Sequence, residues 1–117
     1  LFDAGAILNE SPEQIVQRQV NAYNHHDAQV FGETYAQDGV VVRPSAFVRT
    51  PAAIAAAYAQ LFAANPHLHV EIVDRSVNGA TVTDKESLSG FADGTTRTAT
   101  VTYTVANGAI ARAEAQA

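Results

Sequence analysis

Two carboxylates spaced two residues apart, Asp84 and Glu86, are the residues of this chain best placed to do chemistry. They lie in the stretch 81–91, TVTDKESLSGF, which is typical of a β-strand. On a strand they share a face with Val82 and Leu88, so we expect both acids to point inward. Buried carboxyl groups are costly unless they are paired, hydrogen-bonded or protonated. The spacing predicts a general acid/base pair; the alternative is a structural pair bound to arginines or turned to solvent.

Histidines form a second candidate group. His67, His69 and Glu71 alternate along one predicted strand face, a pattern that could hold a metal ion. Neighbouring positions on one strand rarely converge on one ion, so we predict no metal site here. His69 alone, beside the carboxylates, is predicted to act as a further acid/base residue.

The composition excludes several classes of site and partner. The chain has no cysteine, and no phosphate-binding glycine loop or serine nucleophile elbow, so we expect no cofactor and no thiol or serine-hydrolase chemistry. Its net charge is −5 and it has no basic cluster, which argues against nucleic acid or an anionic membrane as partner. No apolar run approaches the roughly 20 residues of a membrane span.

The length of 117 residues, with 47% hydrophobic and 16% charged residues, is typical of one globular domain. We expect residues 1–10 to form an arm and 11–117 to form the domain. The chain begins at Leu1 and contains no methionine, which we expect of a processed or trimmed product. The compartment is left open: the cytoplasm is slightly favoured, and a removed signal peptide is the alternative.

Three helices are predicted from capping signals and apolar periodicity. Ser11-Pro12-Glu13-Gln14 is a capping box that should start a helix running to about Asn24. Asp27 can cap a short second helix, and Thr50-Pro51 can open a third that ends at Asn65-Pro66. The predicted buried positions of the first and third helices are Ile15, Val16, Val20, Ala22, Tyr23, Ile54, Tyr58, Leu61 and Phe62, with the polar Gln19 inside the first stripe.

The strands follow a period of two. We expect a turn at Asp38-Gly39, a strand over 40–43, and a loop or second strand arm over 44–49. After Pro66, four strands are predicted over 68–77, 81–91, 96–106 and 109–117, with turns at Asn78-Gly79, Asp93-Gly94 and Asn107-Gly108. This order predicts an α+β domain with helices packed on one face of a curved, mostly antiparallel sheet.

Four motifs, at 22–27, 31–38, 54–62 and 107–112, resemble the nuclear transport factor two-like superfamily, which includes ketosteroid isomerases and SnoaL-like polyketide cyclases. The resemblance covers residue 11 to the C-terminus. It implies a cone-shaped sheet whose mouth is closed by helices, with a pocket between them, and a homodimer formed through the outer face of the sheet. The threonine-rich strand faces suit such an interface and solvent equally well.

The catalytic residues of ketosteroid isomerases are not retained. By matching along the chain, their tyrosine falls on Gln19, their general base on Arg43 and their protonated aspartate near Val101. The same mechanism with the same residues is therefore excluded. Because the resembling enzymes turn the position of Arg43 into the pocket, this arginine could bind an anionic substrate or pair with Asp84 or Glu86.

These observations predict a domain that binds a small molecule, with no cofactor. The first hypothesis is acid/base chemistry (isomerisation, cyclisation or dehydration) on a small hydrophobic or polyketide-like molecule. The rival is a non-catalytic ligand-binding or dimeric assembly domain of the same fold. The predicted catalytic residues are Asp84, Glu86 and His69, and the predicted ligand-binding residues are Arg43, Gln19, Tyr23, Tyr58, Phe62 and Tyr103.

Overall fold

A computed structural model describes residues 10–116, so most of the predicted arm over 1–10 lies outside the described residues. The described residues form three helices and six strands. These are α2 (Pro12–Asn24), α3 (Ala28–Glu33), β1 (Tyr35–Arg43), β2 (Ala46–Arg49), α4 (Pro51–Ala64), β3 (His69–Asn78), β4 (Thr81–Ser89), β5 (Arg97–Ala106) and β6 (Ala109–Gln116). No helix in this part of the chain is long and apolar enough to cross a membrane.

Each helix begins with the predicted cap. The Gln14 backbone N–H donates to the Ser11 hydroxyl oxygen at 3.1 Å, and the Gln14 side chain accepts from the Ser11 N–H at 2.8 Å. Asp27 accepts from the Val30 N–H at 3.1 Å. Thr50 caps α4 in the same way, with proline in the first turn. These local bonds satisfy backbone donors that no helix can satisfy internally.

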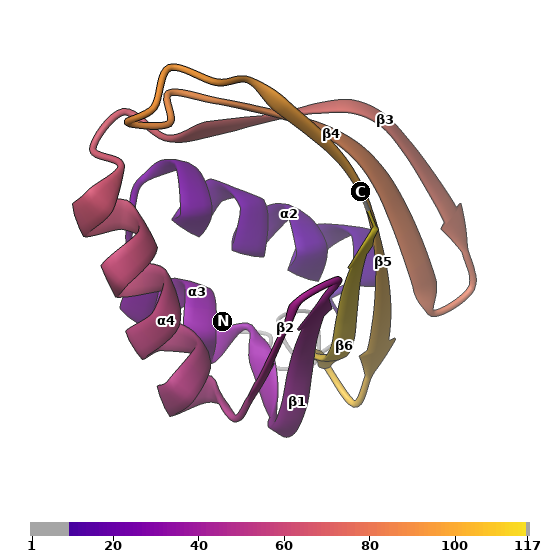
Figure 1. Cartoon of the computed structure of the whole chain (residues 1–117). Coiled ribbons are helices and arrows are strands. Elements are labelled where there is room, and N and C mark those ends of the chain that lie inside the picture. Colours follow the sequence, from indigo (N-terminus) through magenta and orange to yellow (C-terminus); the bar gives the residue numbers. More distant parts are fainter. Residues whose placement is uncertain (1–9, 117) are drawn as a thin grey trace, which may run out of the picture.

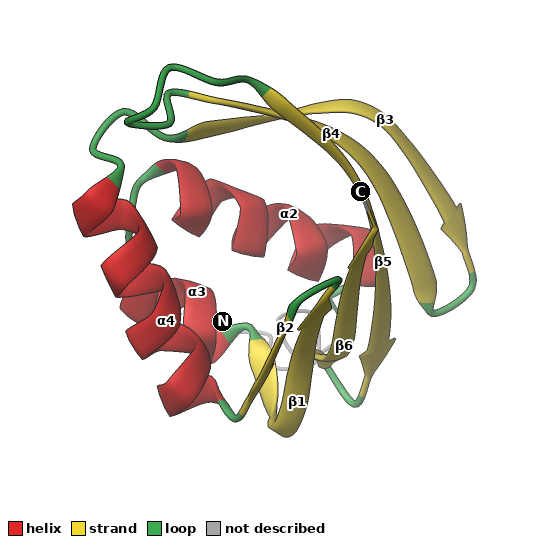
Figure 2. Cartoon of the chain, viewed as in Figure 1, coloured by secondary structure: helices red, strands yellow, loops and turns green. Residues whose placement is uncertain are grey.

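The strands form one sheet in the order β2-β1-β6-β5-β4-β3. The β1–β6 pair is parallel and every other pair is antiparallel. The sheet curves around α2, while α3 and α4 lie across its open side (Figure 1). All three helices occupy the concave face (Figure 2), so the predicted α+β cone is confirmed.

One predicted turn is wrong. Asp38 and Gly39 belong to β1, which begins at Tyr35, and the register shifts between Tyr35 and Val40. A Cβ on Gly39 would lie 2.9 Å from the Ala36 carbonyl oxygen, so glycine lets the irregular strand fold closely on itself. The Asp-Gly pair marks a bulge instead of a strand boundary.

Candidate functional site

A cavity of about 200 Å³ lies between the concave face of the sheet and the helices. Its apolar wall includes Val20, Phe31, Val41, Leu61, Val70, Leu88, Phe91 and Val101. Its polar side chains are Gln19, Tyr23, Tyr35, Arg43, Tyr58, Glu86, Arg97 and Tyr103. A cavity that combines apolar walls with converging polar groups has the composition expected of a site for small molecules.

Glu86 is the carboxylate that reaches this cavity. It lies on the inner face of β4 with 8% of its surface exposed, and the Tyr103 hydroxyl donates to its Oε2 at 3.2 Å. Burial, and then the negative charge of Asp84, raises the pKa of Glu86 to about 7. The Tyr103 hydrogen bond and the positive charge of Arg75 act in the opposite direction. Near neutral pH, Glu86 can therefore both donate and accept a proton.

Asp84 points inward as predicted but does not line the cavity. It is fully buried, and both of its oxygens accept from Arg75, at 2.6 Å and 2.9 Å. Arg75 also donates to the Gln17 side chain of α2 at 2.9 Å. The prediction of two paired carboxylates in one pocket is therefore corrected, because Asp84 is held in a structural ion pair beneath α2.

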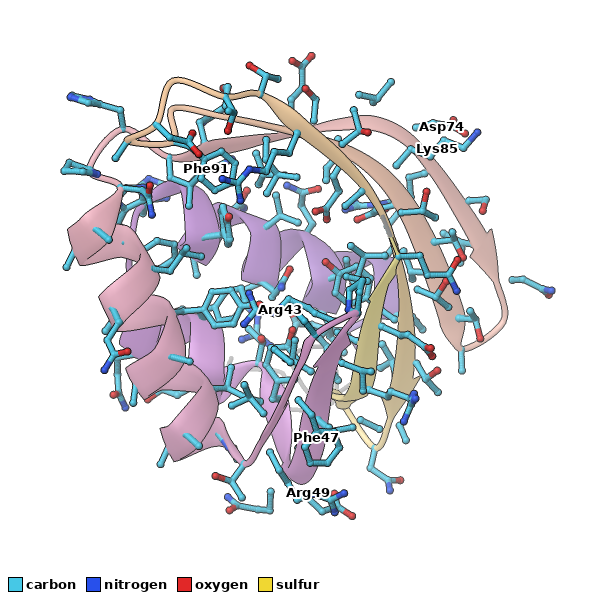
Figure 3. All side chains as sticks on the ribbon, viewed as in Figure 1. Arg43, Phe47, Arg49, Asp74, Lys85 and Phe91 are labelled. Carbon is cyan, nitrogen blue, oxygen red and sulfur yellow. The ribbon has the colours of Figure 1, made fainter. Side chains whose placement is uncertain are left out.

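A bulge in β3 makes this ion pair possible. Ile72 pairs with Glu86 and Asp74 pairs with Lys85, so Val73 is an extra residue in β3. The extra residue reverses the alternation of faces, which turns Arg75 inward opposite Asp84. Figure 3 shows the preceding pair, Asp74 and Lys85, on the outside of the sheet.

His69 does not lie at the cavity, which corrects its predicted catalytic role. On β3, Val70 is buried against Leu88 of β4, so His69 and Glu71 on either side point outward and are exposed. His67 is exposed as well. Within residues 10–116, no three histidine, aspartate or glutamate side chains come together as metal ligands would.

Five of the six predicted ligand-binding residues line the cavity: Arg43, Gln19, Tyr23, Tyr58 and Tyr103. The sixth, Phe62, does not, because its ring packs in the aromatic core, 5.2 Å from the Tyr23 ring and stacked on His26 at 4.6 Å. Aromatic periodicity on a helix predicts a buried face and cannot separate the core from a cavity.

Gln19 holds an unused hydrogen-bonding group. Its Nε2 donates to the Tyr35 hydroxyl at 3.3 Å, whereas its Oε1 is buried without a partner among the described residues. Gln19, Arg43 and Val101, the three positions matched to the catalytic residues of ketosteroid isomerases, all line this one cavity.

Burial also fixes the protonation of the tyrosines. It raises the pKa of Tyr58 above its usual value and that of Tyr103 well above it. Both hydroxyl groups are therefore protonated at neutral pH. The Tyr103 hydroxyl donates its proton to Glu86, and the Tyr58 hydroxyl can donate to a ligand.

The sequence predictions missed Tyr35, Phe91 and Arg97. The chain leaves the short helix α3 at Thr34 and turns the Tyr35 side chain inward at the start of β1. Phe91 and Arg97 flank the Asp93-Gly94 turn, and the Arg97 guanidinium lies 3.9 Å from the centre of the Phe91 ring. An aromatic and an arginine on either side of a predicted turn were the available signal.

One protein-family model matches most of the chain. Residues 16–113 match the family model of the SnoaL-like domain. No curated protein matches the chain significantly.

Several solved structures share the fold. An uncharacterised cystatin-fold protein from Novosphingobium aromaticivorans has a TM-score of 0.84 and 19% sequence identity, covering 93% of this chain and 100% of its own. A suggested polyketide cyclase from Sinorhizobium meliloti has a TM-score of 0.79 and 28% identity, covering 87% of this chain and 93% of its own. A protein with a ketosteroid isomerase-like fold from Catenulispora acidiphila, in complex with trimethylamine, has a TM-score of 0.80 and 21% identity, covering 92% of this chain and 87% of its own.

Proposed function

Since this chain belongs to the SnoaL-like domain family and has the fold of the nuclear transport factor two-like superfamily, we propose that its cavity binds a small, mostly hydrophobic molecule and that Glu86 exchanges a proton with it. The cavity of about 200 Å³ is smaller than the roughly 300–1,000 Å³ of drug-sized sites, so we expect a ligand of about one or two rings. The likeness to a suggested polyketide cyclase supports a carbonyl-bearing ligand.

The observation that carries the proposal is the position of Glu86. Its carboxyl group lies at the wall of the cavity, is hydrogen-bonded to Tyr103, and has a pKa of about 7. A general base works best when its pKa is close to the working pH, and burial provides that match here.

The reaction class is proton transfer at a carbon beside a carbonyl group. Glu86 would take the proton, the electron pair of the C–H bond would form the carbon–carbon double bond of an enolate, and the π pair of the carbonyl group would move onto its oxygen. The hydroxyl groups of Tyr23 and Tyr58, on the helix side of the cavity, can donate hydrogen bonds to that oxygen. Return of the proton to another carbon isomerises the molecule. Attack of the enolate on a second carbonyl cyclises it, and the oxygen of that carbonyl then takes the proton from Glu86.

Deuterium exchange on 2-tetralone, a small bicyclic ketone, tests this proposal. We expect the protein in D₂O to accelerate exchange beside the carbonyl in a saturable way, as NMR would record. Glu86→Gln should lower the rate by about 10²-fold or more, the usual share of a general base. Glu71→Gln, a change on the exposed face of β3, is the matched control and should keep the rate.

Two outcomes would contradict acid/base catalysis. If Glu86→Gln exchanges deuterium as fast as the unsubstituted protein, Glu86 is not the base. If 2-tetralone binds in the cavity without faster exchange, the rival function of a ligand-binding domain is favoured. The Tyr103 hydrogen bond to Glu86 is compatible with that rival, because it satisfies the carboxyl group locally.

A further inference from the structure

Arg43 carries a positive charge at the cavity, and no carboxylate among residues 10–116 forms a salt bridge with it. It ends β1, and strand alternation turns it to the same face as Val41, which also lines the cavity. Its guanidinium lies over the Tyr58 ring, 5.6 Å from the ring centre. Figure 3 shows Arg43 in the interior of the cone, between α4 and the sheet.

Most of the other arginines among the described residues form ion pairs, whereas Arg43 does not. Four of them have a carboxylate partner: Arg18 with Glu10, Arg75 with Asp84, Arg97 with Asp93 and Arg112 with Glu114. Within residues 10–116, Arg43 and Arg49 make no such pair. Arg49 is exposed on β2 and lies over the Phe47 ring at 5.2 Å, outside the cavity. Arg43 is thus the unpaired arginine that lines the cavity.

The acids near Arg43 are engaged elsewhere. Glu86 also lines the cavity, but it lies beyond salt-bridge distance and is hydrogen-bonded to Tyr103. Glu114, on the strand beside β1, is bonded to Arg112. The Asp84–Arg75 pair is internally neutral. A half-buried guanidinium without a counter-charge favours an anion from outside, because its planar fork binds a carboxylate with two parallel hydrogen bonds.

We propose that the ligand is a small organic anion: an apolar ring system with a carboxylate or similar acidic group bound by Arg43. This inference rests on the proposed function, because it names the class of molecule that the same cavity takes. The ring would lie against Val101 and the tyrosines, and its far end would reach the polar groups of Gln19 and Glu86.

A matched pair of probes tests the charge requirement. 2-Naphthoate and 2-naphthamide have nearly the same shape, and only the first is an anion. In calorimetric titrations at pH 7, we expect naphthoate to bind the unsubstituted protein at least about tenfold more tightly than naphthamide. Equal affinities for the two probes would overturn the inference without any variant.

Variants of Arg43 test whether this residue causes the preference for naphthoate over naphthamide. Arg43→Met keeps roughly the length of the side chain and removes its charge, so the ratio of the naphthoate affinity to the naphthamide affinity should fall to about twofold or less. Arg43→Lys keeps the charge without the fork and should keep part of the preference. Arg49→Met is the control, since it removes the other unpaired arginine and its ring contact outside the cavity. If Arg43→Met does not fold, as judged by circular dichroism, Arg43→Gln replaces it.

The failures are distinguishable. If naphthamide binds and naphthoate binds no better, the cavity takes small molecules but the anion inference is wrong. A preference that survives in Arg43→Met, or that is lost in Arg49→Met, would also overturn it. If neither probe enters the cavity, the proposed function fails and the anion inference fails with it.

Discussion

Glu86 is the residue on which the proposed proton transfer depends. An acid whose pKa is raised by burial binds its proton more tightly in the folded chain than in the unfolded chain. The pKa of Glu86 is raised from 4.5 to about 7, so between these two pH values the folded protein binds more protons than the unfolded chain. Glu86 therefore contributes its full share of folding stability below about pH 4.5. This contribution is lost as the pH rises through about 7.

Replacing Glu86 should remove this dependence on pH. We expect Glu86→Gln to gain stability relative to the unsubstituted protein between pH 5 and pH 8, by roughly 3 kcal/mol at most. Urea unfolding of both proteins across this range measures the difference. Glu71→Gln changes an exposed glutamate and should run parallel to the unsubstituted protein. A constant difference between Glu86→Gln and the unsubstituted protein would mean that the pKa of Glu86 is not raised.

At the scale of elements, the bulge in β3 and the first half of α2 hold the site in place. The bulge at Val73 turns Arg75 inward, and α2 covers the resulting ion pair through Gln17. The second half of α2 then carries Gln19, Val20 and Tyr23 along the cavity. One helix thus seals the Asp84–Arg75 pair at one end and forms a wall of the cavity at the other.

Breaking this pair should be costly. We expect Arg75→Met to lower the free energy of unfolding by roughly 3–5 kcal/mol, because Asp84 would be left buried and unpaired. The double variant Arg75→Met/Asp84→Leu should be more stable than the single variant, since it removes the buried charge as well. Lys85→Met, which changes an exposed cation in the same sheet, is the control. A single variant as stable as the unsubstituted protein would show that the pair contributes little.

At the scale of the whole molecule, the sheet is open, and the convex face of its strands β4 and β5 is polar. The outward positions of β4 and β5 pair threonine, lysine and serine side chains across the strands, as at Thr83–Thr102 and Lys85–Thr100. The resemblance to the superfamily predicts a homodimer on this face, and the polar surface fits a partly polar interface or solvent equally well. The oligomeric state stays a prediction.

Analytical ultracentrifugation tests this prediction by measuring the oligomeric state. We expect a homodimer at micromolar concentration, and we expect Thr102→Arg to shift it to monomer, because Thr102 lies in the middle of the outer face between β4 and β6. Ala56→Arg, on the exposed side of α4, adds the same charge away from that face and should leave the dimer intact. A dimer that persists in Thr102→Arg would exclude this face, and a monomeric unsubstituted protein would exclude the dimer.

Local sequence determined where the helices begin and which side chains of β4 point inward. The capping bonds of Ser11 and Gln14 join residues three apart, so the start of α2 could be predicted without the rest of the fold. Alternation in β4 correctly turned Asp84 and Glu86 inward. Short-range bonds and a period of two depend only on neighbouring residues, which is why they can be recognised in the sequence.

The tertiary structure decided which of these residues meet the cavity. The bulge at Val73 depends on pairing between β3 and β4, and it brings Arg75 to Asp84. Parallel pairing of β1 with β6 sets Arg43 in the cavity wall. The sequence alone identified both carboxylates of β4 as candidates for acid/base chemistry. Contacts between distant strands separated them into a structural ion-pair partner and one cavity acid, because strand register is set by long-range pairing.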